Sequence, residues 1–198
     1  MNMAIRENDP EDNGGAARAV HPPDPRVEAA ASGDRAAAQS LLLELLPRVR
    51  NLVRYLCRGD SEVDDIAQLA LCEILRSLRT YRNEGSLHGW IDRITVRVTL
   101  RRLRQRRNDE QRREASIPEL RAVSAKPEQP DEHTLRRQTA RYLDALPVEQ
   151  REAIVLHHIV GLSVPEVSAE LSIPFETARS RLRLGMEKLR DQLAKSPS

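Results

Sequence analysis

Aromatic residues are scarce in this sequence, with one Phe, one Trp and three Tyr among 198 residues, while 31% of the residues are charged. Such a composition limits the apolar area that the chain can bury, which favours two small units over one large core. Patterns typical of strands are almost absent, whereas Ala, Leu, Arg and Glu dominate and apolar residues recur at helical spacing. The sequence therefore predicts an all-α protein with two small helical domains.

Cysteine is also rare. Cys57 and Cys72 are too few and too far apart for a disulfide framework or a zinc knuckle, so we expect a reducing compartment and no nucleophilic thiol. The N-terminus lacks the apolar centre of a signal peptide, and no apolar run is long enough to cross a bilayer. These absences predict a cytoplasmic protein.

Patterns that would carry chemistry are missing as well. His157 and His158 are adjacent, so on a helix they point about 100° apart and would not share a metal ion. The spacings provide neither a phosphate-binding glycine loop nor a Ser/His/Asp or paired-carboxylate set. We expect no catalytic residue, no metal and no cofactor, and therefore no enzyme.

Positive charge is concentrated in one segment of the chain. The formal net charge is only +2, so a nucleic-acid role depends on where the charge lies. Between residues 97 and 113, eight arginines stand against only two acids. Residues 1–24 are acidic, contain Gly and Pro and have few large apolar residues, which predicts a disordered tail. The polar, proline-containing stretch 108–134 predicts a linker.

Helix start signals organise the chain between the tail and the linker. Three helices are predicted here from residues that can cap their first free amides. These residues are Asp34 for the first helix, Ser61 together with Asp64 for the second, and Ser86 for the third. The first of these helices carries an apolar stripe past Pro47, which we expect to kink or restart it.

The segment from residue 161 to residue 190 has the start and stop signals of a helix-turn-helix. Gly161 suits a left-handed helix cap, Ser163 and Glu166 have the spacing of a capping box, and Pro174 opens a second, longer helix. This arrangement is typical of a DNA-binding motif whose second helix enters the major groove. Side chains able to reach bases and phosphates gather where that helix begins, at Glu176, Thr177, Arg179, Ser180 and Arg181. A helical hairpin with a solvated charged face is the alternative.

The expected helix over residues 62–78 has an unusual outer face. Its core side is formed by the apolar residues Val63, Ile66, Ala67, Ala70, Ile74 and Leu78. The opposite side carries a small apolar strip rimmed by polar residues, formed by Asp65, Gln68, Leu69, Cys72, Leu75 and Arg76. Such a strip is typical of a protein interface. Alternatively, another helix of the same domain covers it.

The helix after Ser86 favours nucleic-acid binding. Its apolar face carries Leu87, Ile91, Ile94 and Val98, and a neighbouring face carries a row of arginines at Arg93, Arg97, Arg101 and Arg104. Aligned guanidinium groups can follow phosphates and release counterions, and an adjacent aromatic residue or loop pocket can accept an unstacked base. Trp90 lies beside the row, although a Trp there is more often part of the core. The alternative is a charged face that is simply solvated.

Taken in order, these parts resemble a sigma factor, and specifically the extracytoplasmic-function group, group 4 of the sigma-70 family, which keeps only the second and fourth sigma domains. The resemblance covers Pro25 to Leu193. It is strongest in three motifs, DDIAQ at 64–68, YRNEGSLHGWIDRI at 81–94 and LPVEQREAIVLHHIVGLSVPEVSAELSIPFETARSRL at 146–182. It implies sigma domain 2 over residues 25–107 and sigma domain 4 over residues 135–195.

The resemblance also implies a function, namely promoter-specific initiation of transcription by RNA polymerase. In such proteins the first motif grips the β′ clamp of the polymerase, which assigns core binding to Asp65, Gln68, Leu69, Cys72 and Arg76. The next loop takes up a flipped base of the −10 element, which implicates Asn83, Glu84, Gly85 and Ser86. The basic helix then holds the melted strand through Arg93, Arg97, Arg101 and Arg104. The recognition helix reads the −35 element through Glu176, Thr177, Arg179, Ser180 and Arg181.

The partners implied by the resemblance are the polymerase core, through its β′ clamp and β flap, promoter DNA, and an anti-sigma factor. Two other functions remain open at this stage. A sigma mimic would occupy an anti-sigma factor without touching a promoter, but the basic helix argues against it. A stand-alone helix-turn-helix repressor would leave the interface helix and the loop without a purpose.

The sequence departs from the family pattern at four positions. Leu69 replaces the usual acidic residue, which would alter core affinity, and Arg97 stands where Asn is frequent. Glu176 replaces a small residue, so it and Arg97 would alter the promoter sequence that is preferred. Ser172 occupies a turn position that usually carries Gly, and we expect strain there because Ser tolerates a positive φ less well.

Overall fold

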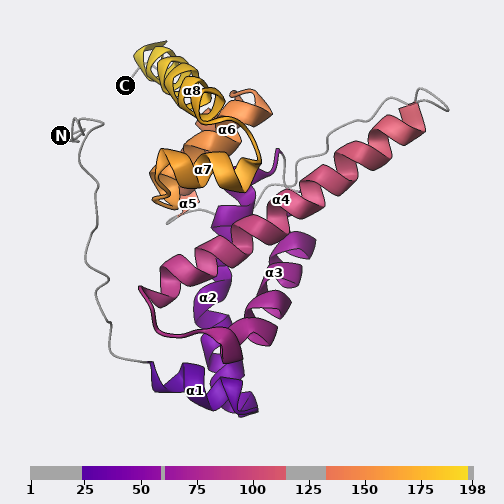
Figure 1. Ribbon diagram of the computed structural model, residues 1–198, viewed down its shortest axis with the longest axis vertical. Helices are drawn as coiled ribbons and strands as arrows, with labels where there is room; N and C mark the ends of the chain where they lie inside the picture. The colour runs from indigo at the N-terminus through magenta and orange to yellow at the C-terminus, as the bar shows by residue number, and fades with distance from the viewer. Residues whose placement is uncertain (1–23, 59–60, 115–132, 196–198) are drawn as a thin grey trace.

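The computed structural model describes residues 24–58, 61–114 and 133–195, in which every regular element is helical. The N-terminal domain contains α1 (Pro25–Ala31), α2 (Arg35–Leu56), α3 (Val63–Ser77), the short 3-10 helix η1 (Leu78–Thr80) and α4 (Leu87–Glu114). The C-terminal domain contains α5 (His133–Asp144), α6 (Val148–Ile154), the π-helical turn η2 (Val155–Ile159), α7 (Val164–Leu171) and α8 (Phe175–Lys195). The prediction of an all-α protein with two helical domains is therefore confirmed (Figure 1).

Helix α2 is the element against which the N-terminal domain is built. Asp34 caps it as predicted, because its carboxylate accepts hydrogen bonds from the amides of Ala36 at 2.8 Å and Ala37 at 3.2 Å. The helix continues through Pro47 without a break, so the expected restart does not occur. Its inner face buries Leu41, Leu45, Val49, Leu52, Val53 and Leu56. Helices α1, α3 and α4 all pack against α2.

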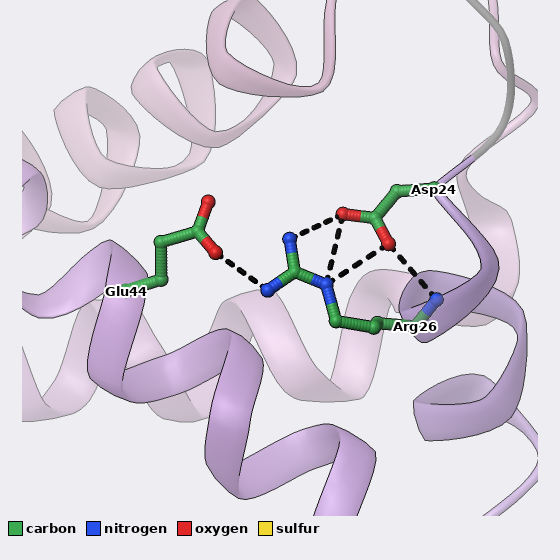
Figure 2. Close-up of polar contacts among 3 residues, drawn as sticks. All are labelled: Asp24, Arg26 and Glu44. Carbon is green, nitrogen blue, oxygen red and sulfur yellow. Dashed lines mark hydrogen bonds and ion pairs between the residues drawn. The ribbon is translucent and has the colours of Figure 1, made fainter.

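Helix α1 was not expected from the sequence. Asp24, which we placed at the end of the tail, instead caps this helix by accepting a hydrogen bond from the Arg26 amide at 2.9 Å. The Arg26 guanidinium also binds the Asp24 carboxylate at 2.7 Å and Glu44 of α2 at 2.5 Å (Figure 2). This ion pair lowers the pKa of Asp24. The contacts hold α1 against α2, while residues 1–23 lie outside the described part of the chain.

Helices α3 and α4 depart from the sequence expectation at their ends. The predicted capping box at Ser61 and Asp64 is wrong: Glu62 stands at the N-cap of α3 with no capping hydrogen bond, and Asp64 pairs with Arg50 of α2 at 2.7 Å. Helix α4 runs to Glu114 and so enters the stretch we had expected to be linker from residue 108. Arg106 stabilises this extension, because it pairs with Glu110 one turn later at 3.3 Å as well as with Glu62 at 2.7 Å.

The polar side chains on the buried face of α4 have hydrogen-bond partners within the domain. Asp92 is 5% exposed, and Arg48 of α2 binds both of its carboxylate oxygens, at 2.8 and 2.6 Å. The hydroxyls of Thr95 and Thr99 donate to the backbone carbonyls one turn earlier, at 2.9 and 2.7 Å. Because these groups are satisfied internally, α4 can bury one face against α2 and α3 while the opposite face carries charge.

The helix-turn-helix of the C-terminal domain forms as predicted. Gly161 has φ +82°, and the Glu166 carboxylate accepts hydrogen bonds from the Ser163 amide and hydroxyl, both at 2.8 Å. Ser172 ends α7 in the left-handed region, with φ 55°, as the departure from Gly suggested. Helical spacing predicted that Ile159 belongs to the core of this domain, and this prediction is wrong, because Ile159 is 39% exposed. It ends the π-helical turn η2, whose wider winding moves later side chains away from the face that a regular α-helix would give them.

We predict that Ser172→Gly increases the free energy of unfolding by about 1 kcal/mol, because Gly adopts the left-handed conformation without the steric cost that Ser bears. Urea unfolding followed by circular dichroism measures the change.

Gly161→Ala is the matched control for this change. No atom lies within 4 Å of a Cβ placed on Gly161, so the substitution introduces backbone strain alone. It should lower stability by a similar amount. A Ser172→Gly protein no more stable than the parent would show that the turn is not strained.

Candidate functional site

The outer face of α3 is exposed, as its strip of polar and apolar residues predicted. Leu69 is 51% exposed, and the other side chains assigned to core binding, at Asp65, Gln68, Cys72 and Arg76, are exposed as well. Leu75 differs from this group because it is half-buried and packs against the core. Within the described residues, therefore, no helix of this chain covers the strip, which is available for a partner.

The loop between η1 and α4 has a defined conformation. The Tyr81 hydroxyl donates to the Gly85 carbonyl at 3.0 Å, and its ring lies 5.1 Å from that of Trp90. Asn83 adopts the left-handed region, with φ 57°. Ser86 caps α4 as predicted, because its hydroxyl accepts a hydrogen bond from the Gly89 amide at 3.0 Å. Trp90 is half-buried and contacts the core, so it supports the loop from below.

A cavity of about 280 Å³ opens beside this loop, between α1 and η1. Tyr81 and Asn83 form one side of it, and Val27 and Glu28 of α1 form another. Glu84 and Ser86 are exposed, whereas Asn83 and Gly85 are half-buried. The sequence did not indicate the contribution of α1, because the helix itself was not expected. The cavity is bounded by aromatic, apolar and polar groups, which is a suitable lining for a planar base.

The predicted row of arginines lies on the exposed face of α4. Arg93, Arg97, Arg101 and Arg104 are all exposed, while Ile91 and Ile94 on the apolar face are buried. The outer members of the row bind the C-terminal domain: Arg93 pairs with Glu166 at 2.9 Å, and Arg104 donates to the Glu170 carbonyl at 3.0 Å.

Helix α8 presents a polar face at its N-terminal end. Glu176, Arg179 and Ser180 are exposed, and Thr177 and Arg181 are half-buried. The Ser180 hydroxyl donates to the Thr177 carbonyl at 3.0 Å. Further exposed side chains on this part of the helix were not singled out from the sequence, among them Phe175 at its first position and Arg183 one turn after Arg179. Both could have been predicted from the sequence, because they lie at helical spacing from the residues that were singled out.

A close approach of two helices holds α8 in place. A Cβ at Gly185 would lie 2.8 Å from a side-chain carbon of Ile154, so α8 meets α6 at a distance that only Gly allows. Ala178 and Leu182 are buried on the same helix. The polar face at the start of α8 therefore belongs to a rigidly supported helix.

Neither a metal site nor a membrane-spanning segment was found in the described ranges. They contain no group of three or more His, Cys, Asp or Glu residues arranged to hold a metal ion. Their helices are also too short or too polar to span a bilayer.

Comparisons with known proteins agree with this arrangement. The model of Sigma-70 region 2 matches residues 41–108, and that of Sigma-70 region 4 matches residues 136–189. The ECF RNA polymerase sigma factor SigE of Mycolicibacterium smegmatis is 34% identical over 175 residues, which are 85% of this chain and 67% of that protein. The ECF RNA polymerase sigma-E factor of Escherichia coli K12 is 30% identical over 166 residues, 79% of this chain and 86% of that protein.

Solved structures support the same fold. RpoE of Bartonella quintana, crystallised with the anti-sigma factor NepR, has a TM-score of 0.58 and 22% identity, over 80% of this chain and 98% of that one. CnrH, solved with the cytosolic domain of CnrY, has a TM-score of 0.51 and 23% identity, over 86% of this chain and 97% of that one. With both family regions in the expected order and relatives matched along most of their length, this chain belongs to the extracytoplasmic-function sigma factors of the sigma-70 family and is an RNA polymerase sigma factor.

Proposed function

We propose that this sigma factor, a group 4 member of its family, acts in the cytoplasm by binding the polymerase core and directing it to promoters with −10 and −35 elements. The observation that carries the proposal is the presence of separate exposed faces of different chemistry. The α3 face is apolar with a charged rim, the α4 face is basic, and the start of α8 is polar. Each face suits one of the three partners: the core, melted DNA and duplex DNA.

The α3 face suits the β′ clamp. Leu69 and Cys72 provide apolar area, and Asp65, Gln68 and Arg76 provide polar groups around it. An interface with an apolar centre and a polar rim gains affinity from the centre and specificity from the rim. The C-terminal domain would meet the β flap, and an anti-sigma factor would compete with the core for these faces.

The loop and α4 suit the −10 element. A base leaving the duplex needs a pocket that replaces its lost stacking, and the cavity beside Asn83 provides aromatic and polar walls. The strand that remains unpaired then lies near Arg97 and Arg101, where guanidinium groups can bind its phosphates. Base capture by the loop thus supplies discrimination, while α4 supplies retention.

The start of α8 suits the −35 element in duplex form. Arg179 and Ser180 are exposed on a helix that α6 holds firmly, and such a helix can enter the major groove. Arg181 and Arg183 lie on the same part of α8 and would bind phosphates beside the bases. The protein performs no covalent chemistry in this proposal, because promoter opening requires only differential binding of melted and paired DNA.

We predict that Asp65→Arg combined with Gln68→Ala weakens core binding by about tenfold or more, since both changes alter the rim of the proposed interface. Binding of labelled protein to purified core measures this. Asp109→Arg, an equal charge reversal at an exposed position of α4, should leave core affinity near the parent value. Equal affinity of the double variant and the parent would exclude the α3 face.

Cys72 provides an independent test of the same face. It is exposed, whereas burial raises the pKa of the Cys57 thiol to about 12, so alkylation near neutral pH modifies Cys72 first. We predict that core polymerase slows this alkylation severalfold, measured by mass spectrometry, and that Cys72→Ser removes the rapid phase. The same alkylation rate with and without core would contradict the assigned interface.

We predict that Asn83→Gly lowers open-complex formation on a duplex promoter by about tenfold, because the side chain that faces the flipped base is lost. Gly keeps the left-handed backbone that Asn83 adopts, and Ser86 remains in place to cap α4. Permanganate footprinting of thymines in the promoter bubble measures opening.

A template whose −10 region is already mismatched is the control for this change. On it, Asn83→Gly should recover most of the activity, because the cost of unpairing no longer has to be met. Full opening of the duplex promoter by the variant would show that the loop does not capture a base.

A further inference from the structure

Arginine side chains make a series of hydrogen bonds between the two domains. In each of five, an arginine of the N-terminal domain donates to an oxygen of the C-terminal domain. These pairs are Arg54 with the Asp144 carboxylate, Arg58 with the Asp144 carbonyl, Arg93 with Glu166, Arg104 with the Glu170 carbonyl, and Arg107 with Glu152. Three of the arginines lie on α4, and Figure 1 shows the C-terminal helices gathered beside that helix. The C-terminal domain thus occupies part of the basic face.

The Arg93 pair involves a carboxylate with two roles. One oxygen of Glu166 accepts from the amide and hydroxyl of Ser163 and so caps α7, while the other binds Arg93 at 2.9 Å. The hydrogen bonds from Ser163, with a further contribution from Arg93, lower the pKa of Glu166. The first helix of the helix-turn-helix therefore begins at a charge that faces α4.

The other two α4 contacts continue along the same side of the helix. Arg104 reaches the carbonyl of Glu170, near the end of α7. Arg107 pairs with Glu152 of α6, which is only 6% exposed. We define Glu152, Glu166 and the Glu170 carbonyl as the acidic edge of the C-terminal domain. Between the arginines that this edge binds, Arg97 and Arg101 are exposed.

We infer that the acidic edge is a docking surface for the basic face of α4, so that in the free protein the helix-turn-helix domain and the −10 strand compete for the same arginines. The inference rests on the proposed function in one respect, the role of α4 in strand binding. A guanidinium that donates to Glu166 is shielded from a phosphate, because the nearby carboxylate repels the anion. Undocking of the domain makes Arg93, Arg104 and Arg107 available together.

The contact at the start of α7 is weak enough to be reversed. The side chains of Arg93 and Glu166 are 57% and 48% exposed, and an exposed ion pair changes an equilibrium by up to about fivefold. The other contacts add to it, since Arg107 pairs with the buried Glu152 and α2 packs against α5 and α6. Together they favour the docked form, while the ion pairs leave it sensitive to salt. A melted strand offers a series of phosphates in place of the acidic edge, and it displaces the domain by the same electrostatics.

The test measures docking and strand binding separately in the full chain. Energy transfer between a dye on Cys72, which is exposed, and a dye on Lys188→Cys at the outer surface of α8 reports the distance between the domains. A fluorescent single-stranded oligodeoxynucleotide reports occupation of α4. We expect transfer to fall when salt is raised and when the oligonucleotide binds.

The decisive variant is Glu152→Gln combined with Glu166→Gln. Gln can still accept the capping hydrogen bonds of Ser163, so α7 keeps its start while the negative charge is lost. This variant should show lower transfer and should bind the oligonucleotide about three- to tenfold more tightly. The matched control is Glu149→Gln with Asp191→Asn, which removes two charges from exposed positions of the same domain. The control should keep the transfer of the parent and have a smaller effect on affinity.

Each outcome decides the question. Unchanged transfer in the Glu152/Glu166 variant, or an equal gain of affinity in the control, overturns the inference. If no form binds the oligonucleotide, the proposed role of α4 fails, while the salt dependence of transfer still tests docking. If circular dichroism shows that the Glu152 change disrupts folding, Glu166→Gln alone must lower transfer and raise affinity, though less, for the inference to hold.

Discussion

The apolar face of α2 is the constraint on which the rest of the N-terminal domain depends. Helices α1, α3 and α4 pack against it, and α5 of the C-terminal domain reaches it as well. Because α3 must bury Ile66, Ala70 and Ile74 on this side, Leu69 and Cys72 necessarily point outward. The same argument leaves the arginines of α4 on the solvent side. The faces proposed to bind the core and the melted strand are thus consequences of packing around one helix.

Arginine serves different purposes in this chain, which explains how a net charge of only +2 is compatible with DNA binding. Arg48 and Arg26 are structural, since they join helices through Asp92, Asp24 and Glu44. Arg97 and Arg101 face solvent. A third group is shared with acceptors of the C-terminal domain. The count of arginines in the sequence therefore overstates the basic surface that the free protein presents to a nucleic acid.

Much of the fold could be predicted because its signals are local. The Asp34 cap, the Ser163–Glu166 capping box and the helical spacing on α3 each involve residues within one or two turns of one another. The features that were missed depend on partners far apart in sequence. Asp64 binds Arg50 instead of capping its own helix, Arg26 needs Glu44, and the domain contacts join α4 to α6 and α7. The exposure of the site residues could be predicted from periodicity, whereas the contacts of Arg93 and Arg104 could not.

The contacts between the domains differ in how much the fold depends on them, and Asp144 is the residue on which it depends most. Its carboxylate binds Arg54 and lies 3.4 Å from a guanidinium nitrogen of Arg151, a side chain that is completely buried and whose pKa burial lowers. Loss of Asp144 would leave that buried charge uncompensated, so it would harm the fold along with the contact. Glu166 does not compensate a buried charge in this way. A genetic selection for chains with separated domains would therefore recover changes at Glu166 and not at Asp144. This sigma factor can thus evolve a looser domain arrangement by substitutions in the acidic edge of its helix-turn-helix.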